Sequence, residues 1–212
     1  NINSPLFPLT GLGFDLFWEI TKRTSLRMAV YDGTPDEFES NPYNLKWKLG
    51  SNQGMLFVSE FVTGNPLSSG REYCFKAGAY LHKHNSIYND HTENYGFYFL
   101  ANLEILKNLH FLSQIGISPK HINRHNHYYS LGLKKNNAFR SRPNDEWGLA
   151  VAYAHIDENV AGCETVLEMT YRLQLNEHFY LQPDFQYIIN PAGTDQKIPN
   201  AWVGFLRFGL KL

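Results

Sequence analysis

The chain has 212 residues, a mean hydropathy of −0.38 and a formal net charge of −1 at pH 7. A charge this close to zero leaves no basic footprint for a nucleic-acid partner. No apolar run approaches about eighteen residues, which excludes membrane-spanning helices. A membrane β-barrel is not excluded, because the strand residues that face its lumen dilute the hydropathy, and an aromatic content of 15% suits its interfacial girdles.

Alternation with a period of two predicts about eleven strands, because successive side chains of a strand point to opposite faces. The predicted ranges are 12–20, 24–32, 54–64, 73–84, 95–107, 110–118, 126–134, 146–156, 163–175, 178–190 and 200–212. These segments approach the roughly nine to eleven residues of a tilted membrane strand, whereas globular strands peak near about five or six. We therefore predict an all-β fold, a transmembrane antiparallel up-and-down β-barrel with lipid outside and water inside.

Two segments leave alternatives open. The stretch 101–112 also fits an amphipathic helix, although the aromatic run before it favours a strand. Pro183 interrupts the strong alternation of 178–190 and cannot donate to a sheet ladder, so we expect a bulge at that position.

The connections fall into two sets if they alternate between the two ends of a barrel. The expected periplasmic set is 21–23, 65–72, 108–109, 135–145 and 176–177, and the expected outer set is 33–53, 85–94, 119–125, 157–162 and 191–199. Barrels of this class have short periplasmic turns and longer outer loops, a rule that 135–145 breaks. The segment 33–53 is the best candidate for a loop that folds inward or binds something.

The last segment places apolar residues at every second position up to the final residue, namely Leu206, Phe208, Leu210 and Leu212. This is similar to the signal that the outer-membrane assembly machinery recognises, although most such strands end in Phe. A closed bacterial barrel has an even number of strands, and no signal peptide is visible at the start of the sequence, so we expect Asn1 to be either a mature start or an internal cut. We therefore expect 1–212 to be one barrel domain that lacks its N-terminal strands; a miscount or closure by association of copies are the alternatives.

Four motifs, in order, resemble the C-terminal part of the carbohydrate-selective porin family (OprB type). They are Ala29-Val30-Tyr31-Asp32-Gly33-Thr34-Pro35, Phe57-Val58-Ser59-Glu60-Phe61, Arg142-Pro143-Asn144-Asp145-Glu146-Trp147-Gly148-Leu149 and Tyr180-Leu181-Gln182-Pro183-Asp184-Phe185-Gln186-Tyr187-Ile188-Ile189-Asn190-Pro191-Ala192-Gly193. The last is the specific one, and Ala192 replaces a Gly that is often found there. The resemblance implies the latter half of a sixteen-stranded outer-membrane channel through which sugars diffuse.

The alternation assigns polar residues to a lumen-facing side, and a passive channel needs such a wet wall rather than a catalytic group. The candidate residues of this solute pathway are Arg27, Glu60, Glu164, Glu168, Arg172, Gln182, Asp184 and Gln186, with Gln174 also on this face. Their amides, carboxylates and guanidinium groups suit sugar hydroxyls, and Tyr31, Tyr128 or Tyr180 suit the apolar faces of sugar rings. The competing interpretation is that these charges only solvate the lumen and pair across strands.

Other chemistry finds little support in the sequence. The histidine pair His82 and His84 and the group His121, His125 and His127 have no companion ligands at metal-site spacing, so we expect no metal and no cofactor. Cys74 and Cys163 lie on different predicted strands, which does not indicate a disulfide. Arg140 and Arg142 beside Asp145 suggest a stabilising salt bridge in a turn.

Two further functions compete with a porin that contacts sugars and outer-membrane lipid. An outer-membrane barrel hydrolase would need a serine such as Ser113 or Ser130 hydrogen-bonded to a histidine, and no sequence signature joins them. A soluble β-barrel that binds a ligand or partner would need a second layer over its apolar face, because large apolar patches are rare on soluble monomers.

Overall fold

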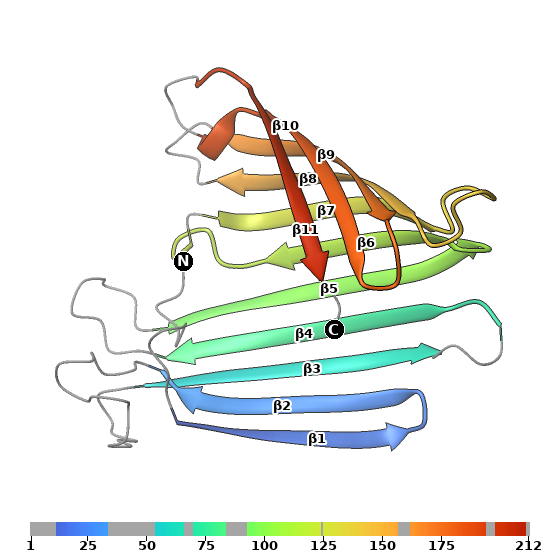
Figure 1. Cartoon of the computed structure of the whole chain (residues 1–212). Helices are drawn as coiled ribbons and strands as arrows, with labels where there is room; N and C mark the ends of the chain where they lie inside the picture. Colours follow the sequence, from blue (N-terminus) through green and yellow to red (C-terminus); the bar gives the residue numbers. More distant parts are fainter. Residues whose placement is uncertain are drawn as a thin grey trace.

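The computed structural model describes residues 12–33, 54–65, 70–83, 93–123, 125–156, 162–193 and 198–210. These form one antiparallel sheet of eleven strands whose order follows the chain from β1 to β11 (Figure 1). The strands are β1 Gly13–Thr21, β2 Thr24–Asp32, β3 Met55–Asn65, β4 Tyr73–Lys83, β5 Glu93–Leu106, β6 Leu109–Ile117, β7 His125–Asn136, β8 Glu146–Ile156, β9 Cys163–Gln174, β10 Phe179–Ile189 and β11 Ala201–Leu210. One 3-10 turn, η2 (Pro191–Gly193), follows β10. None of the described helical turns has the length and hydropathy of a membrane-crossing helix.

The register keeps apolar side chains of neighbouring strands on the same face of the sheet. One row across five strands consists of Phe14, Val30, Phe57, Leu81 and Tyr95. A second row near the other edge consists of Leu131, Val151, Leu167, Tyr187 and Trp202. We call this the outer face, and the face carrying the alternate residues the inner face. The period-two pattern of each strand is thus in phase with that of the next.

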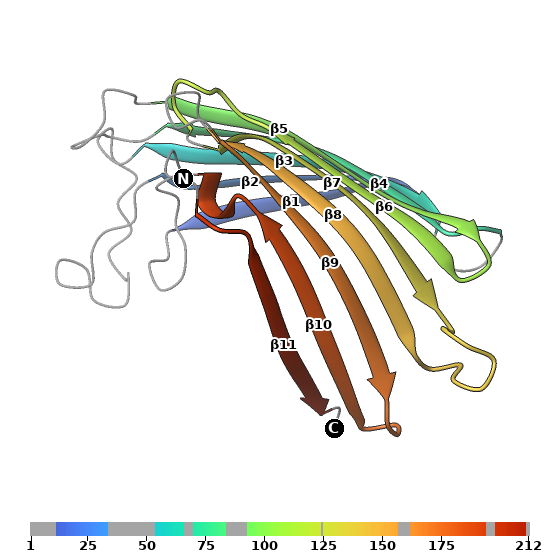
Figure 2. The same ribbon diagram turned by 90° about the horizontal axis from the view of Figure 1, so that it is seen from above.

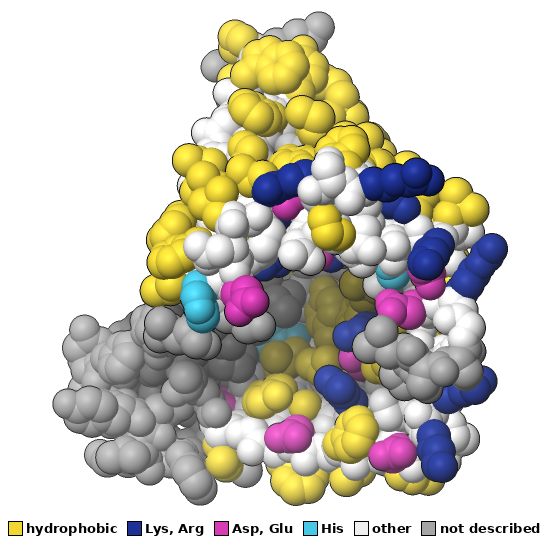
Figure 3. Space-filling view, turned by 45° about the vertical axis from the view of Figure 1, so that its right-hand side comes forward, with side chains coloured by type: hydrophobic (Ala, Val, Ile, Leu, Met, Phe, Trp, Pro, Cys, Tyr) yellow, Lys and Arg dark blue, Asp and Glu magenta, His cyan; other side chains and the backbone are white. Residues whose placement is uncertain are grey.

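The outer face is not packed into a protein core. Among the described residues, only Leu56, Ala101 and Ile156 are buried hydrophobic residues. Outer-face aromatic side chains remain widely exposed, with Phe14 at 71% and Trp202 at 78%. In the space-filling view the hydrophobic side chains cover the periphery, while Lys, Arg, Asp and Glu gather around a hollow (Figure 3). A soluble barrel or sandwich would cover so large an apolar surface, and no second layer does so in the described part.

The sheet is strongly curved and open. Seen from above, β9–β11 turn away from the plane of β2–β5, so that the sheet forms a trough (Figure 2). Within the described residues, β1 pairs only with β2, and β11 pairs only with β10. The sheet therefore has the geometry of a barrel segment with two free edges.

The predicted strands are confirmed, with their ends shifted by a few residues at most. The helical alternative for 101–112 is wrong, because this stretch forms the end of β5, a tight turn and the start of β6. That turn is closed by Asn108 at φ 61°, a left-handed conformation that Asn adopts more readily than other side chains.

The expected bulge at Pro183 is also wrong. The pairs Leu181 with Leu173 and Asp184 with Thr170 keep one register on both sides of the proline. On the β11 side the register is continuous as well, with Pro183 opposite Leu206. The strand therefore tolerates the missing N–H group without an inserted residue.

The connections alternate between the two ends of the sheet as predicted. Those at one end are 22–23, 66–72, 107–108, 137–145 and 175–178, and those at the other are 33–54, 84–92, 118–124, 157–162 and 190–200. The connection 137–145 is again the long member of the short set. Most of the candidate binding loop 33–53 lies outside the described residues.

Candidate functional site: the inner face of the sheet

All eight predicted pathway residues lie on the inner face, as the strand register shows. They form two groups at opposite ends of the strand order. Arg27 and Glu60 belong to β2 and β3, whereas the others belong to β9 and β10. The structure thus places all eight residues on one face of the sheet, where they form two separate patches.

The first patch is centred on Glu60. Arg27 is its direct partner across β2 and β3. The Tyr98 hydroxyl donates a hydrogen bond of 2.9 Å to Glu60 Oε2, and Lys76 Nζ lies 3.8 Å from Glu60 Oε1. A cavity of about 600 Å³ beside this patch is lined by Asp15, Phe17, Arg27, Tyr31, Glu60 and Tyr98, among others. The patch therefore joins one acidic group, two basic groups and aromatic rings on a recessed wall.

The second patch joins β9, β10 and β11. Gln186 Nε2 donates to Glu168 Oε2 at 2.7 Å, and Gln182 Nε2 donates to Thr170 Oγ1 at 2.9 Å. An Arg207 amino group lies 3.7 Å from Asp184 Oδ2. These contacts form a ladder of amides and opposite charges that extends onto β11.

Each of three inner-face arginines stacks on an aromatic ring. The Cζ–centroid distances are 5.4 Å for Arg27 on Phe17, 4.1 Å for Arg172 on Tyr180 and 4.8 Å for Arg207 on Phe205. A ring face attracts a cation within about 6 Å. Stacking fixes the guanidinium plane and leaves its edge, which carries the N–H donors, for other partners.

Two predicted residues are less accessible than the sequence suggests. Asp184 is only 1% exposed and lies under its neighbours, with Arg207 above it at 54% side-chain exposure. Glu164 Oε2 accepts a hydrogen bond of 2.6 Å from the Ala192 N–H, so it anchors the η2 turn. Asp184 and Glu164 therefore shape the wall.

The sequence prediction missed Lys76, Tyr98 and Arg207. The signal for Arg207 is its alternation with the outer-face residues Leu206 and Phe208, which places it on the inner face opposite Gln182. Lys76 and Tyr98 are likewise at inner positions of their strands. Their contact with Glu60 depends on the register between strands, which no single strand reveals.

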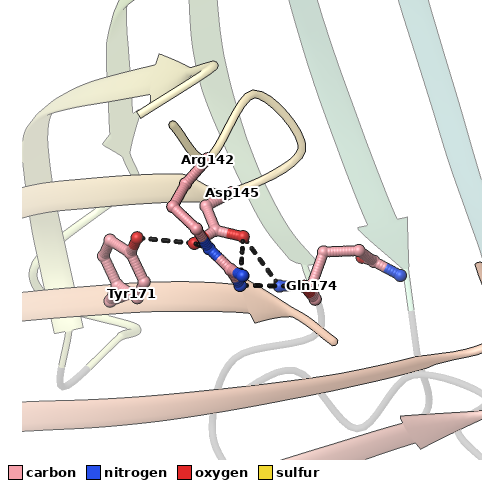
Figure 4. A network of polar contacts seen from close by, with 4 residues as sticks. All are labelled: Arg142, Asp145, Tyr171 and Gln174. Carbon is pink, nitrogen blue, oxygen red and sulfur yellow. Dashed lines mark hydrogen bonds and ion pairs between the residues drawn. The ribbon is translucent and has the colours of Figure 1, made fainter. Parts of the chain in front are cut away.

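The connection 137–145 is fixed by a network around Asp145 (Figure 4). Arg142 donates from Nε to Oδ2 at 2.8 Å and from an amino group to Oδ1 at 3.1 Å. Tyr171 donates its hydroxyl at 2.7 Å, and the Gln174 N–H donates at 3.0 Å. The expected salt bridge between Arg142 and Asp145 is thus confirmed, and it ties the turn to β9.

The same network shifts the acidity of both charged groups. Burial of Asp145, which is 1% exposed, would by itself raise the pKa of its carboxyl group. Hydrogen bonds from Arg142, Tyr171 and the Gln174 N–H outweigh burial, so the pKa of Asp145 is lowered. The hydrogen bond to Asp145 in turn raises the pKa of the Arg142 guanidinium.

The histidines and cysteines have other roles in the described part of the chain. There, no three His, Cys, Asp or Glu side chains converge as metal ligands. His82 is buried against the Gly33 carbonyl oxygen at 2.6 Å, and His127 and His155 both contact Asn126 Oδ1. Cys74 and Cys163 are free thiols. His84 lies outside the described residues.

The two serines of the hydrolase alternative lie on opposite faces. Ser113 pairs with Ala101 and Leu131 on the outer face, and Ser130 pairs with Gln114 on the inner face.

Comparisons with known proteins agree with this geometry. A family model described as "Carbohydrate-selective porin, OprB family" matches residues 62–212. The high-pH structure of Pseudomonas putida OprB superposes with a TM-score of 0.78 at 18% sequence identity, over 97% of this chain. The superposed part is 60% of that porin's length. No curated protein matches the sequence.

Proposed function

Because the chain belongs to the OprB family of carbohydrate-selective porins, we propose that it is part of an outer-membrane channel for passive diffusion of sugars and other small hydrophilic solutes. The observation that carries this proposal is the division of one long-stranded sheet into two faces. The outer face of the sheet is apolar, whereas charged and amide side chains lie on the inner, concave face. That division is what a lipid-embedded, water-filled barrel requires.

The outer face supports a location in the bacterial outer membrane. Rows of Leu, Phe, Tyr and Trp would contact hydrocarbon. The adjacent rings of Tyr187 and Trp202, with centroids 4.6 Å apart and planes tilted by 38°, suit a membrane interface. The β11 strand carries Leu206, Phe208 and Leu210 on this face. It is the segment that the assembly machinery would recognise.

The inner face supports diffusion without covalent chemistry. Carboxylates and amides such as Glu168 and Gln186 would exchange hydrogen bonds with sugar hydroxyls, and stacked arginines would offer oriented donors. A solute must bind strongly enough to enter and weakly enough to leave, and several weak contacts along a wall satisfy both. The predicted pathway residues act in this scheme as wall contacts, with Asp184 and Glu164 holding their neighbours.

A complete channel requires more strands than the sheet contains. An unpaired strand edge facing hydrocarbon leaves N–H and C=O groups unsatisfied, each at a cost of several kcal/mol. We propose that further strands join β11 to β1 and close the barrel, as the 60% coverage of the solved porin suggests. The intact mass of the purified chain tests this, since a mass near 24.5 kDa would require closure by other means.

The direct test of function is single-channel recording of the full-length protein in planar bilayers. We expect stepwise ion conductance that falls as a neutral mono- or disaccharide is added, since a sugar in the lumen obstructs ions. As the control, the viscosity of the bath is raised to the same value without a sugar or any other polyol. Reconstituted protein that conducts no ions, or conductance that sugars leave unchanged, would contradict the proposal.

A further inference from the structure

Glycine and tyrosine face each other across strands repeatedly on the inner face. Six such pairs are in direct register: Gly13 with Tyr31, Gly78 with Tyr98, Gly96 with Tyr80, Gly209 with Tyr180, and Gly116 with both Tyr98 and Tyr128. The two pairs on β4 and β5 are crossed, since each strand supplies one glycine and one tyrosine. Glycine inside a strand weakens it and often marks a place where another group approaches closely.

In four of the pairs the tyrosine ring lies directly on the glycine. A Cβ atom at Gly96 would lie 2.5 Å from Tyr80 Cε1, and one at Gly13 would lie 2.5 Å from Tyr31 Cε1. At Gly78 and Gly209 the added atom would overlap the rings of Tyr98 and Tyr180. Any other residue at these positions would force the ring to move. Glycine is therefore what allows these rings to lie along the wall.

Three of the four flat rings have a further partner, two through the hydroxyl group and one through the ring face. Tyr98 crosses the Gly78 position and reaches Glu60 on the far side of β4 at 2.9 Å. The Tyr80 hydroxyl donates to Asn94 Oδ1 at 3.4 Å. Tyr180 carries Arg172 stacked at 4.1 Å. A ring fixed in this way adds its thickness to the wall, whereas an upright tyrosine would project its full length into the lumen.

Gly116 is arranged differently, because neither Tyr98 nor Tyr128 places its ring within 4 Å of a Cβ atom there. The tyrosine atom nearest to a Cβ at Gly116 would be Tyr128 Cβ, at an ordinary 3.7 Å. The Tyr128 ring therefore does not cover its glycine, and the residue is 39% exposed. A methyl group added at Gly116 has room. Gly116 is therefore the matched control position for Gly13, Gly78, Gly96 and Gly209.

We propose that Gly13, Gly78, Gly96 and Gly209 determine the bore of the channel by letting their paired tyrosines lie flat. The proposal rests on the proposed function, because a bore matters only if the sheet surrounds a pore. It assigns the glycines a role in selecting solutes by size, in addition to the chemistry of the polar side chains.

The test compares full-length Gly78→Ala with Gly116→Ala in planar bilayers, using ion conductance and the size cut-off for partitioning of polyethylene glycols. Gly78→Ala is expected to lose conductance and exclude smaller polymers, because Tyr98 is displaced into the lumen. Gly116→Ala, with the same added methyl group on the same face, is expected to match the wild type.

The double variant Gly78→Ala/Tyr98→Ala separates displacement of the ring from misfolding. It is expected to regain at least the wild-type conductance, since the obstructing ring is gone. Wild-type conductance in Gly78→Ala, or a double variant that stays narrow, would overturn the role in bore. Absence of conductance in the wild type would instead refute the proposed function.

Discussion

Glu168 lies at the middle of β9 on the inner face, where its carboxylate accepts a hydrogen bond from Gln186. Glu168→Gln removes one negative charge from the wall while keeping an amide oxygen that can accept the same bond. Because charges lining a pore govern which ions enter it, we predict a shift of the reversal potential in a salt gradient toward anion selectivity.

The control for this substitution is Glu177→Gln, in the exposed turn 175–178. Glu177 lies in the turn beyond the end of β9, nine residues along the chain from Glu168, and exposed charges are screened within about a Debye length of 8–10 Å, so this variant is expected to keep the wild-type reversal potential. Equal shifts in both variants would show that Glu168 is not a lumen charge.

Asp145 supports a prediction about pH and stability. Its pKa is lowered in the folded protein, so its stabilising contribution is present above the ordinary aspartate value of about 3.9 and is lost as pH falls through the folded value. At neutral pH we expect Asp145→Asn to reduce the free energy of unfolding by about 2 kcal/mol, because the hydrogen bonds to a buried carboxylate are weakened.

The measurement is urea unfolding in lipid vesicles at pH 7 and at successively lower pH. The difference between Asp145→Asn and the wild type is expected to shrink as pH falls below about 3.9. The comparison variant is Glu177→Asn, because Glu177 is another acidic residue at the same end of the sheet. A difference that stays constant with pH would contradict the role of the ionised carboxylate.

At the scale of the strand, the two faces of β8 and β9 predict opposite responses to one substitution. Met169 is 54% exposed on the outer face of β9, near the middle of the strand. Met169→Arg would place a cation in hydrocarbon, and we expect a loss of about 2–4 kcal/mol in the free energy of unfolding in bilayers.

The matched variant is Ala150→Arg. Ala150 is exposed on the inner face and pairs directly with Glu168, so the new guanidinium would meet water and a carboxylate. We expect nearly unchanged stability and reduced conductance. If Ala150→Arg were the more damaging of the two in bilayers, the assignment of faces would be reversed.

Strands could be predicted from the sequence because each carries its own alternation, which barrel geometry requires from end to end. The range 146–156 coincides with the observed β8. The prediction of a bulge at Pro183 was wrong because one missing N–H group can be tolerated between two long ladders. The register is continuous on both sides of the proline. That tolerance depends on the whole sheet.

The site was predictable only up to the face of each residue. Alternation assigns Gly78, Glu60 and Tyr98 to the inner face but gives no relation among them, because the pairing register lies between strands. The burial of Asp184 and the engagement of Glu164 by the Ala192 N–H likewise depend on neighbours from other segments. Rings lying flat on glycines were for the same reason invisible in the sequence.

At the scale of the whole molecule, the arrangement is a curved wall and not a packed domain. We expect its stability to come from about a hundred ladder hydrogen bonds of the strands, at roughly one per residue, and from hydrocarbon on the outer face in the proposed membrane setting. Apolar side chains that face hydrocarbon do not need to pack against one another to avoid water. This explains why the described part contains so few buried hydrophobic side chains.

A spin-label scan of β10 in the full-length protein embedded in bilayers would show which face of the sheet meets lipid and which meets water. Single cysteines would replace residues 179–189 in turn, in a background with Cys74 and Cys163 changed to serine, and collision with oxygen would be compared with collision with a water-soluble nickel chelate. We predict that labels at odd positions such as Phe185 and Tyr187 collide mainly with oxygen, and those at even positions such as Gln182 and Gln186 with the chelate. Chelate access at the odd positions, or no alternation at all, would contradict a sheet with lipid on one face and water on the other.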